Sequence, residues 1–448
     1  MHKKAIVHIL TKARMESDAF ISEINAMEDL SEKYWIKNII FYKWDLIKFD
    51  ALISKLEKFH ILCKNYSNKE DLKDQVNEIH KKFKILFVNT PLELLVWIAN
   101  EVMNSVWLKV TDNSDIFRNK FLQRELIQEY NPELGIKFIK WTHKNLDVNE
   151  ISKEIGFPFI IKPVNWVLSS WVAKIRNAKE FDVYQSEYSL FHDKLLATKW
   201  IDVKELLVEE FIDWEFYSID YFVNSKWIVS FTAPMRWEHW INIGVNDYFH
   251  FSGTLSKKVL DRFKDFELEK FIKDTVKACG IRNTFIHHEF KINTKLELKT
   301  IELNGRIWGK RLEIYKECFG SNLYELILWE PFKEKLLCNY ILFSIFSTKE
   351  WILTGFSENI IKNIESRKTV FQLNKNSKLI WKEIWLTKNW FWNVGHIFLK
   401  WKSLKDLEED YSYIKKIYKK ILIVEKEEKK GKKEKKSIFK KIKGIFKK

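Results

Sequence analysis

Alternating apolar and polar positions predict a succession of strands and helices over residues 1–112. Short apolar runs that suit strands occur at Ala5–Leu10, Ile36–Phe41, Ile61–Lys64 and Ile85–Val88. The apolar spacing of Asp50–Phe59 predicts a helix, and Thr90 can cap another helix that begins with Pro91. Strands that alternate with helices favour a βαβ arrangement with a parallel sheet.

Residues 113–280 contain further predicted helices and strands. We expect helices at Ser114–Tyr130, from Asp147 onward and at 258–280, and strands at Phe159–Ile161 and Ala173–Ile175. An antiparallel meander is expected from Leu206–Ile212, Glu215–Phe222 and Ile228–Ala233. Beyond residue 330 the spacing predicts helices near Lys333–Phe346 and at Leu404–Ile421.

The segment Thr284–Lys310 carries candidate metal chemistry. Phe285–Ile292 and Leu296–Leu303 have the pattern of a hairpin with a polar turn. A short turn would place Glu289 and Glu302 nearly opposite each other, and like charges at such positions destabilise a sheet. A hard cation between them would remove the repulsion, because Mg²⁺ binds a few carboxylate oxygens together with substrate phosphates. The alternative is a solvated hairpin with ordinary surface charges.

A second candidate site lies at the end of the predicted strand Phe159–Ile161. Lys162 follows this strand directly, and Pro163 then ends it. The next loop contains Ser169 and Ser170. A lysine fixed by a strand beside a serine-bearing loop could cradle phosphate groups. A surface lysine next to a disordered loop is the simpler alternative.

The composition is that of a globular protein with room for roughly two to four domains. The 448 residues are 46% hydrophobic and 31% charged, and no apolar run is long enough to span a bilayer. The apolar run Ala5–Leu10 suits a first strand better than a signal peptide. Four widely spaced cysteines lack metal-ligand or redox spacing, which indicates buried thiols in a reducing cytoplasm.

Positive charge is concentrated in the last residues of the chain. The net charge is +16, and residues 425–448 hold 12 lysines against 4 glutamates. Residues 437–448 would form a basic amphipathic helix that can lie on an anionic membrane surface, with a solvated disordered tail as the alternative. Its apolar stripe would consist of Ile438, Phe439, Ile442, Ile445 and Phe446. No basic-aromatic recognition motif is present, so we expect no nucleic-acid partner.

Four segments occur in a characteristic order and spacing: FPFIIKP, LLVEEFIDWE, HHEF and IELNGR. Together they resemble the ATP-grasp superfamily, specifically its carboxylate–amine ligases such as the L-amino-acid ligases, from about Thr90 to Ile423. The resemblance implies an α/β and α+β multidomain fold. An N-terminal Rossmann-like pre-ATP-grasp domain would precede a two-lobed ATP-grasp fold of antiparallel sheets with helices. The implied parts are the N-terminal domain 1–112, a lid lobe 113–208, a catalytic lobe 209–330, its C-terminal part 331–424 and the tail 425–448.

The resemblance also implies roles for individual residues. Lys120 and Lys162 resemble the two ATP lysines, although Asn119 stands where the family has an acidic residue. Ser169 and Ser170 fall in the flexible loop that covers the phosphates. The remaining correspondences are the adenine hinge at Glu209, Glu210 and Ile212, the ribose-binding Glu215, the Mg²⁺ ligands Glu289, Glu302 and Asn304, and the phosphoryl-stabilising Arg306.

The implied activity is ATP-dependent ligation of a small-molecule carboxylate to an amine through an acyl phosphate, with release of ADP and phosphate. ATP and two Mg²⁺ ions are the implied cofactors, with Mn²⁺ as an alternative. The competing interpretations are a carboxylase or carbamoyl-phosphate-type enzyme, and a non-catalytic ATP-binding scaffold. Neither the substrates nor the oligomeric state follows from the sequence. Candidates for the substrate pocket are Arg236, Glu238, His239, His250, His287 and Arg311.

Glycine is rare in this chain and tryptophan is abundant. The 12 glycines and 20 tryptophans together match the glycine content of about 7% in average proteins. Asn165-Trp166, Asp213-Trp214 and Asn389-Trp390 resemble Asn-Gly and Asp-Gly turns, which need positive φ. Trp171 stands in the phosphate loop, and Trp308 stands where the resembled motif has glycine. We hypothesise that UGA codons decoded as glycine stand here as tryptophan, and we expect many of these side chains to be exposed in turns. The alternative is an inactive homologue with genuine tryptophans.

Overall fold

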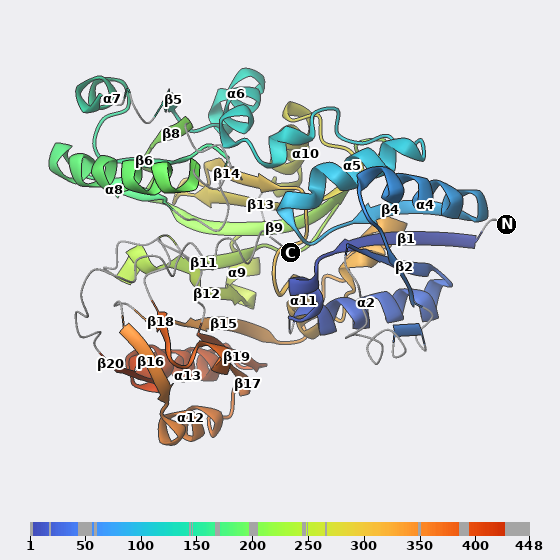
Figure 1. Ribbon diagram of the computed structural model, residues 1–448. Coiled ribbons are helices and arrows are strands. Elements are labelled where there is room, and N and C mark those ends of the chain that lie inside the picture. The colour runs from blue at the N-terminus through green and yellow to red at the C-terminus, as the bar shows by residue number, and fades with distance from the viewer. Residues whose placement is uncertain are drawn as a thin grey trace. The chain divides into compact units, whose positions relative to one another are not determined.

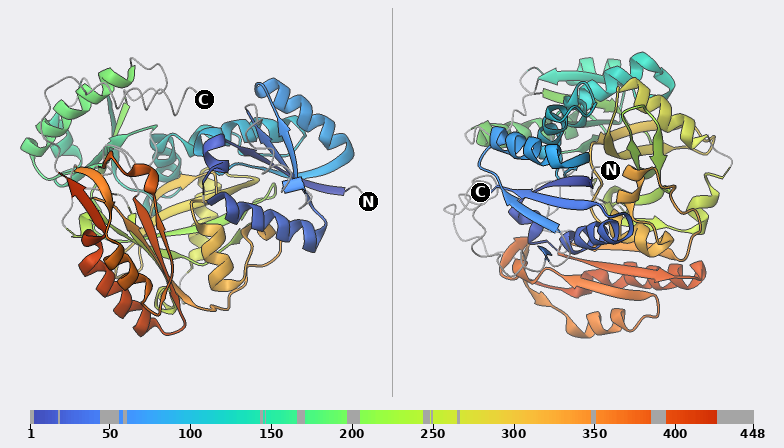
Figure 2. Two further views of the ribbon diagram at one scale, coloured as in Figure 1. Left: turned by 60° about the horizontal axis from the view of Figure 1, so that its bottom comes forward. Right: turned by 90° about the vertical axis from the view of Figure 1, so that its right-hand side faces the viewer.

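The computed structural model describes residues 3–17, 19–43, 56–57, 61–142, 145, 147–165, 171–196, 205–243, 248, 250–264, 267–347, 351–384 and 394–425 (Figure 1; Figure 2). The chain divides into two compact units. The first unit comprises residues 1–136, 212–237 and 254–340. The second unit comprises residues 137–211, 238–253 and 341–448.

The first unit begins with a parallel sheet in the order β3-β2-β1-β4. These strands are β1 (Lys3–Leu10), β2 (Lys37–Tyr42), β3 (Ile61–Asn65) and β4 (Phe83–Asn89). α4 (Lys69–Lys82) and α5 (Val96–Ser105) lie on one side of the sheet, and α2 (Ala19–Tyr34) lies on the other (Figure 1). β1 is buried from Ala5 to Leu10, as expected for a strand covered on both faces. The predicted parallel sheet is confirmed, whereas most of the predicted helix Asp50–Phe59 falls outside the described residues.

Two predicted helices of the first unit begin later than expected. Thr90 Oγ1 accepts a hydrogen bond from the Leu92 amide at 3.2 Å, but the 3₁₀ turn η1 (Glu93–Leu95) comes next and α5 starts only at Val96. Likewise, Ser114–Tyr130 forms the short turn η2 (Ser114–Phe117) and then α6 (Lys120–Tyr130). α6 begins there because the Asn119 side chain caps it by accepting a hydrogen bond from the Leu122 amide.

The predicted hairpin of the first unit is confirmed. β13 (Thr284–Ile292) and β14 (Leu298–Asn304) pair antiparallel. The hairpin belongs to a sheet with the strand order β14-β13-β9-β11, in which β9 spans Glu215–Val223 and β11 spans Met235–His239. The short strand β10 (Val229–Phe231) also pairs with β9. α10 (Leu268–Ala278) packs Phe271 and Ile272 into the same core as Ile286 and Phe290.

The prediction of one helix over 258–280 is wrong, because a turn at residues 262–264 separates α9 (Lys257–Asp261) from α10. The remaining short elements of the first unit are α1 (Lys12–Met15), η3 (Pro132–Leu134), α11 (Arg311–Phe319) and η5 (Leu323–Leu328).

The second unit contains an antiparallel sheet in the order β5-β8-β6-β7. Its strands are β5 (Phe138–Thr142), β6 (Phe159–Pro163), β7 (Ala173–Ile175) and β8 (Glu205–Glu210). α7 (Val148–Glu154) is capped by Asp147 as predicted, and α8 (Ala178–Leu196) follows β7. The predicted meander is wrong at its first strand, because β8 pairs with β5 and β6, whereas β9 and β10 pair as expected.

The prediction of a helix near Lys333–Phe346 is wrong. Residues 331–338 have no regular structure, and β15 (Asn339–Ile345) is a strand in which all seven residues are buried. A short continuous apolar run suits a buried strand and a buried helix equally, so periodicity could not separate them.

The C-terminal part of the second unit has two groups of strands. One has the order β15-β19-β17 and the other β18-β16-β20. The new elements are η4 (Trp240–Ile243), β12 (His250–Leu255), β16 (Trp351–Phe356), α12 (Glu358–Glu365), β17 (Val370–Lys375), η6 (Ser377–Leu379), β18 (Lys382–Ile384), β19 (Gly395–Trp401), α13 (Leu404–Ile417), η8 (Tyr418–Ile421) and β20 (Leu422–Glu425). The last predicted helix is thus confirmed as α13. None of the helices in the described ranges has the length and apolar character to cross a membrane, and the predicted amphipathic segment 437–448 lies outside those ranges.

Candidate active site

The candidate metal ligands of the first unit lie on the hairpin formed by β13 and β14. Glu289 pairs directly with Glu302 in the strand register, and His287 pairs with Asn304. The side chain of Glu289 is 13% exposed and that of Glu302 is 21% exposed. Directly opposed carboxylates that are largely removed from water require compensating positive charge.

Lys120 supplies part of that positive charge. It is the first residue of α6, and its Nζ lies 3.0 Å from Glu302 Oε1. Burial alone would lower the pKa of Lys120, but the carboxylates of Glu302 and Glu93 outweigh burial and raise it. Lys120 is therefore a buried, protonated side chain at the hairpin, unlike the solvated surface lysine that its helical position alone would suggest.

A second ion pair belongs to the same cluster and was not predicted. Arg306 Nη2 lies 3.2 Å from Glu93 Oε2, and both side chains are mostly buried. Burial raises the pKa of Glu93, although the charges of Arg306 and Lys120 oppose the shift. A glutamate in the first turn of a helix is common on general grounds, so the sequence held no sign that Glu93 would face the arginine.

Asn304 offers an amide oxygen on the same hairpin. Its Oδ1 is buried and has no hydrogen-bond partner among the described residues, which is uncommon for a buried polar atom. Within the described ranges, no three or more His, Cys, Asp or Glu side chains form a cluster that could hold a metal alone. Mg²⁺ does not need such a cage, because it binds one or two carboxylates together with substrate phosphates. Glu289, Glu302 and Asn304 therefore fit Mg²⁺.

A buried polar network connects β9 with the hairpin. Asp220 Oδ1 lies 3.1 Å from His287 Nδ1, and Asp220 Oδ2 lies 2.9 Å from Arg311 Nε. On the other side of the imidazole ring, His287 Nε2 lies 3.5 Å from Glu289 Oε1. Burial lowers the pKa of His287, but the Asp220 carboxylate outweighs burial and raises it.

This network holds two of the candidate substrate-pocket residues, His287 and Arg311, inside the first unit. Arg311 is fully buried and also donates a hydrogen bond to Ser218 Oγ. The sequence did carry a signal for Asp220 that was missed, because an aspartate in the middle of the apolar strand FYSIDYFV is rarely buried unless it is paired.

Glu215, the candidate ribose ligand, lies between two arginines. Its Oε1 is 3.4 Å from Arg236 Nε, and its Oε2 is 3.1 Å from Arg262 Nε. All three side chains are partly exposed. Arg236, a candidate for the substrate pocket, is therefore already beside a carboxylate of this chain. At the candidate hinge, the Ile212 carbonyl accepts a hydrogen bond from Lys291 Nζ.

In the second unit, the other candidate ATP lysine is also paired. Lys162 Nζ lies 2.7 Å from Glu209 Oε2, and the side chains are only 7% and 4% exposed. Glu210 Oε1 accepts a hydrogen bond from the Lys137 amide at 2.9 Å. Lys162 is thus fixed by β6 and by Glu209, which excludes the alternative of a solvated surface lysine.

The remaining candidates of the second unit are only partly described. Ser169 and Ser170 lie outside the described residues. Glu238 Oε2 accepts a hydrogen bond from Tyr411 Oη at 2.6 Å, and the rings of His239 and His250 have centroids 4.5 Å apart.

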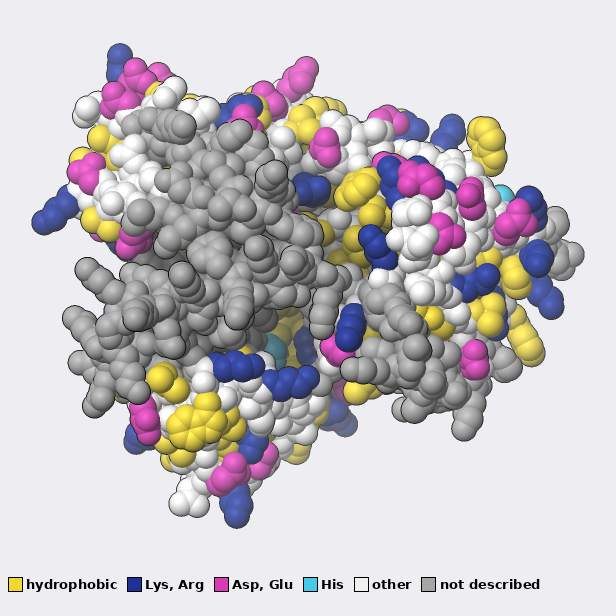
Figure 3. Space-filling model, in the orientation of Figure 1, with side chains coloured by type: hydrophobic (Ala, Val, Ile, Leu, Met, Phe, Trp, Pro, Cys, Tyr) yellow, Lys and Arg dark blue, Asp and Glu magenta, His cyan; other side chains and the backbone are white. Residues whose placement is uncertain are grey.

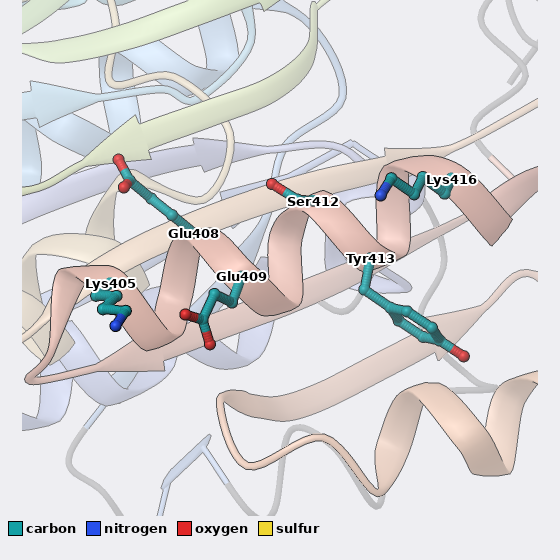
Figure 4. A pocket seen from close by; sticks show the side chains of 6 residues that line it. All are labelled: Lys405, Glu408, Glu409, Ser412, Tyr413 and Lys416. Atoms are coloured by element: carbon teal, nitrogen blue, oxygen red, sulfur yellow. The ribbon is translucent and has the colours of Figure 1, made fainter.

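An open pocket lies elsewhere in the second unit, on the outer face of α13 (Figure 4). Its lining residues are Lys405, Glu408, Glu409, Ser412, Tyr413 and Lys416. All six come from one helix, and their mixed charges are typical of a solvated face. Figure 3 likewise shows Lys and Arg side chains interspersed with Asp and Glu over the described part of one face. The pocket on α13 therefore carries no candidate chemistry.

Comparison with known proteins finds a family that is similar to part of the chain. Residues 155–313 match the ATP-grasp domain family. This part of the chain is therefore similar to an ATP-grasp domain. Of the candidate residues, the match includes Lys162, the hinge and the hairpin, whereas Lys120 lies before its first residue.

Solved structures of other proteins share the ATP-grasp fold. The L-amino acid ligase from Bacillus licheniformis has a TM-score of 0.65 and 17% sequence identity, and the match covers 96% of this chain and 100% of that chain. The N5-carboxyaminoimidazole synthetase from Staphylococcus aureus, in complex with ADP, has a TM-score of 0.60 and 12% identity, with 92% and 97% covered. These likenesses confirm the predicted multidomain α/β and α+β fold.

One relative is similar in sequence over a short stretch. The D-alanine–D-alanine ligase of Thermosipho melanesiensis is 33% identical over 78 residues. The match covers 17% of this chain and 19% of that protein, so the chain aligns with only about a fifth of the curated relative.

Proposed function

We propose that this ATP-grasp protein is an ATP-dependent ligase that activates a carboxylate as an acyl phosphate and joins it to an amine. The cluster on and beside the β13–β14 hairpin carries the proposal. Glu289, Glu302 and Asn304 provide oxygen ligands for a cation, while Lys120 and Arg306 provide positive charge for phosphate oxygens. Positioned cations of this kind are what phosphoryl transfer requires.

The named relatives support the choice of reaction. One similar structure is an L-amino acid ligase, and the short sequence match is to a D-alanine–D-alanine ligase. Both names describe the joining of amino acids. An amino-acid carboxylate and an amino-acid amine are therefore our preferred substrate classes.

In the first unit, we assign Glu289, Glu302 and Asn304 to Mg²⁺, for which Mn²⁺ could substitute. When bound there, the ion would neutralise part of the negative charge of the ATP phosphates. Arg306 would stabilise the transferred phosphoryl group, and Lys120 would exchange its contact with Glu302 for a phosphate oxygen.

The assignment of the remaining ATP contacts rests on the resemblance to the ATP-grasp superfamily. Glu215 would accept hydrogen bonds from the ribose hydroxyls. Lys162 would bind the α- and β-phosphates, and Ser169 and Ser170 would cover them. The adenine ring would lie against the hinge residues Glu209, Glu210 and Ile212. A cytoplasmic location, with a membrane-surface contact through residues 437–448, belongs to the same proposal.

The reaction would proceed in two balanced steps. A carboxylate oxygen attacks the γ-phosphorus, the bond from that phosphorus to the β,γ-bridging oxygen breaks, and ADP leaves. The amine nitrogen then attacks the acyl carbon, an amide bond forms, phosphate leaves and the nitrogen gives up a proton. Both reactants of the first step are anionic, so Lys162 and Arg306 would lower the barrier by offsetting their repulsion.

The test is ADP release from the purified chain with ATP, Mg²⁺ and a library of amino acids offered singly and in pairs. We expect ADP, phosphate and a new amide in stoichiometric amounts for one substrate pair. ADP release that requires bicarbonate in place of an organic carboxylate would identify a carboxylase. Binding of ATP without release of ADP for any pair would favour the scaffold and overturn the proposal.

A further inference from the structure

Positive φ among non-glycine residues is concentrated on tryptophan. Within the described ranges eight non-glycine residues have positive φ, and six of these are tryptophans. The six are Trp35, Trp107, Trp171, Trp227, Trp329 and Trp381, with φ between 57° and 69°. Left-handed backbone is normally confined to glycine and, less often, asparagine or aspartate, because a Cβ atom there approaches the following carbonyl. Tryptophan has no local hydrogen bond to offset this clash.

Trp107, after α5, has the same backbone conformation and hydrogen bonds as Gly280, which follows α10 in the first unit. After α10, the Gly280 amide bonds to the carbonyl three residues earlier, and the next amide bonds to the carbonyl five residues before it. After α5, Trp107 and the residue that follows it make the same two bonds. The φ values are 60° at Gly280 and 62° at Trp107. This is the helix-ending motif in which glycine is strongly preferred.

Other members of the set also lie where glycine ends an element. Trp35 directly follows α2, and Trp329 is the left-handed residue that ends η5. Trp227 lies at the tip of the β9–β10 hairpin, where its amide bonds to the Asn224 carbonyl at 3.2 Å. Short hairpin loops commonly place glycine in the left-handed position. The six tryptophans therefore share one backbone requirement rather than one kind of side-chain contact.

The indole rings gain little from these positions. Trp35, Trp107 and Trp381 are 88%, 90% and 71% exposed. The expectation of positive φ at the Asp213-Trp214 turn is wrong, because Trp214 is half-buried and does not have positive φ. Trp171 and Trp227 do have ring contacts, to Tyr188 at a centroid distance of 5.4 Å and to the Arg282 guanidinium at 3.6 Å. Despite these ring contacts, both residues still have the left-handed φ that favours glycine. For Trp35, Trp107 and Trp381, a large apolar ring in water at a strained φ has no stabilising role in the fold.

We infer that the organism that makes this protein inserts glycine at these six positions, because it decodes UGA as glycine. A gene translated with a genetic code that reads UGA as tryptophan, as it reads UGG, would give tryptophan at each of these sites. The shortage of glycine, with 12 residues against 20 tryptophans, has the same cause. The inference rests on backbone geometry and composition, and it is independent of the proposed ligase activity.

The direct test is the protein purified from its source. Tandem mass spectrometry of peptides that cover the six positions should read glycine at each of them, and the gene should carry UGA there. Tryptophan in the peptides, or UGG codons in the gene, would overturn the inference.

A recombinant test separates the backbone effect from the loss of the indole ring. Trp35 and Trp107 are each changed to Gly and to Ala in the full chain, and the melting temperatures are compared. We expect the glycine variants to melt above the parent and above the alanine variants, because alanine keeps the Cβ clash. Alanine variants that melt at or above the glycine variants would contradict a left-handed requirement at these positions.

Discussion

Lys120 Nζ lies 3.0 Å from Glu302 Oε1, so a buried ion pair joins the first residue of α6 to the end of β14. The register places Glu289 directly opposite the same glutamate. Lys120 therefore supplies part of the positive charge that the two facing carboxylates need.

Restoring glycine near the candidate site should increase activity. The Trp308 ring stacks on His287 with a centroid distance of 5.7 Å, and Trp171 borders the phosphate loop. The variant Trp171→Gly, Trp214→Gly, Trp308→Gly should release ADP at least about tenfold faster than the chain as printed, which corresponds to about 1.4 kcal/mol of barrier. The measurement is coupled-enzyme ADP release, with alanine at the same three positions as the control. Equal rates for the printed chain and the glycine variant would contradict this prediction.

In that glycine background, Glu302→Ala should remove turnover and leave the fold intact. The loss should be at least about 10²–10³-fold, the usual effect of removing a group that stabilises developing charge. Circular dichroism should change little, whereas the melting temperature should fall because the buried Lys120 loses its contact with Glu302. Glu297→Ala, in the exposed hairpin turn, is the matched control. ADP release near the parent rate in Glu302→Ala would show that the site is wrongly assigned.

Lys162→Met should raise the KM for ATP and reduce stability at the same time. The change leaves the buried Glu209 carboxylate, now 2.7 Å from Lys162 Nζ, without its partner, which typically costs about 3–5 kcal/mol. The double variant Lys162→Met, Glu209→Gln should recover the free energy of unfolding but not ATP use. Lys153→Met, on the exposed face of α7, should affect neither property. Recovery of ATP use together with stability would assign Lys162 a structural role only.

Asp220→Asn should destabilise the first unit by about 3–5 kcal/mol, because the fully buried Arg311 loses its ion-pair partner. His287 loses a charged hydrogen-bond acceptor in the same change. Urea unfolding followed by fluorescence measures the effect. Asp274→Asn removes a partly exposed pair with Lys270 and should leave the urea midpoint nearly unchanged. Similar midpoints for the two variants would argue against the buried network.

His8 should make the chain less stable in mild acid. Burial lowers the pKa of His8 from 6.5 to about 4, and its ring faces the uncharged side chains of Asn38 and Asn89. Between these pH values the unfolded chain binds the proton more readily, so the contribution to stability is complete above pH 6.5 and is lost as the pH falls towards 4. His8→Gln should flatten this part of the profile of unfolding free energy against pH. An unchanged slope in the variant would assign the acid sensitivity to other groups.

Local patterns predicted the hairpin, the parallel sheet and the last helix, because each depends on a short-range period or turn. The same reasoning failed at β15, where a fully buried apolar run has no period to distinguish strand from helix. The same reasoning could not predict that Glu93 belongs to the candidate site, because its contact with Arg306 joins residues far apart in the chain. The prediction of the meander was wrong at its first strand for a related reason. Strand alternation shows which residues of one strand share a face, but it does not show which other strand pairs with it.

In the proposed site, the pair of Lys120 and Glu302 would link two binding events. A cation bound by Glu302 and a phosphate bound by Lys120 would each have to separate the same pair. Whichever ligand arrives first removes a competitor of the other, so the two affinities should be positively coupled. Such coupling is reciprocal, and the factor by which the metal strengthens nucleotide binding must equal the factor by which the nucleotide strengthens metal binding.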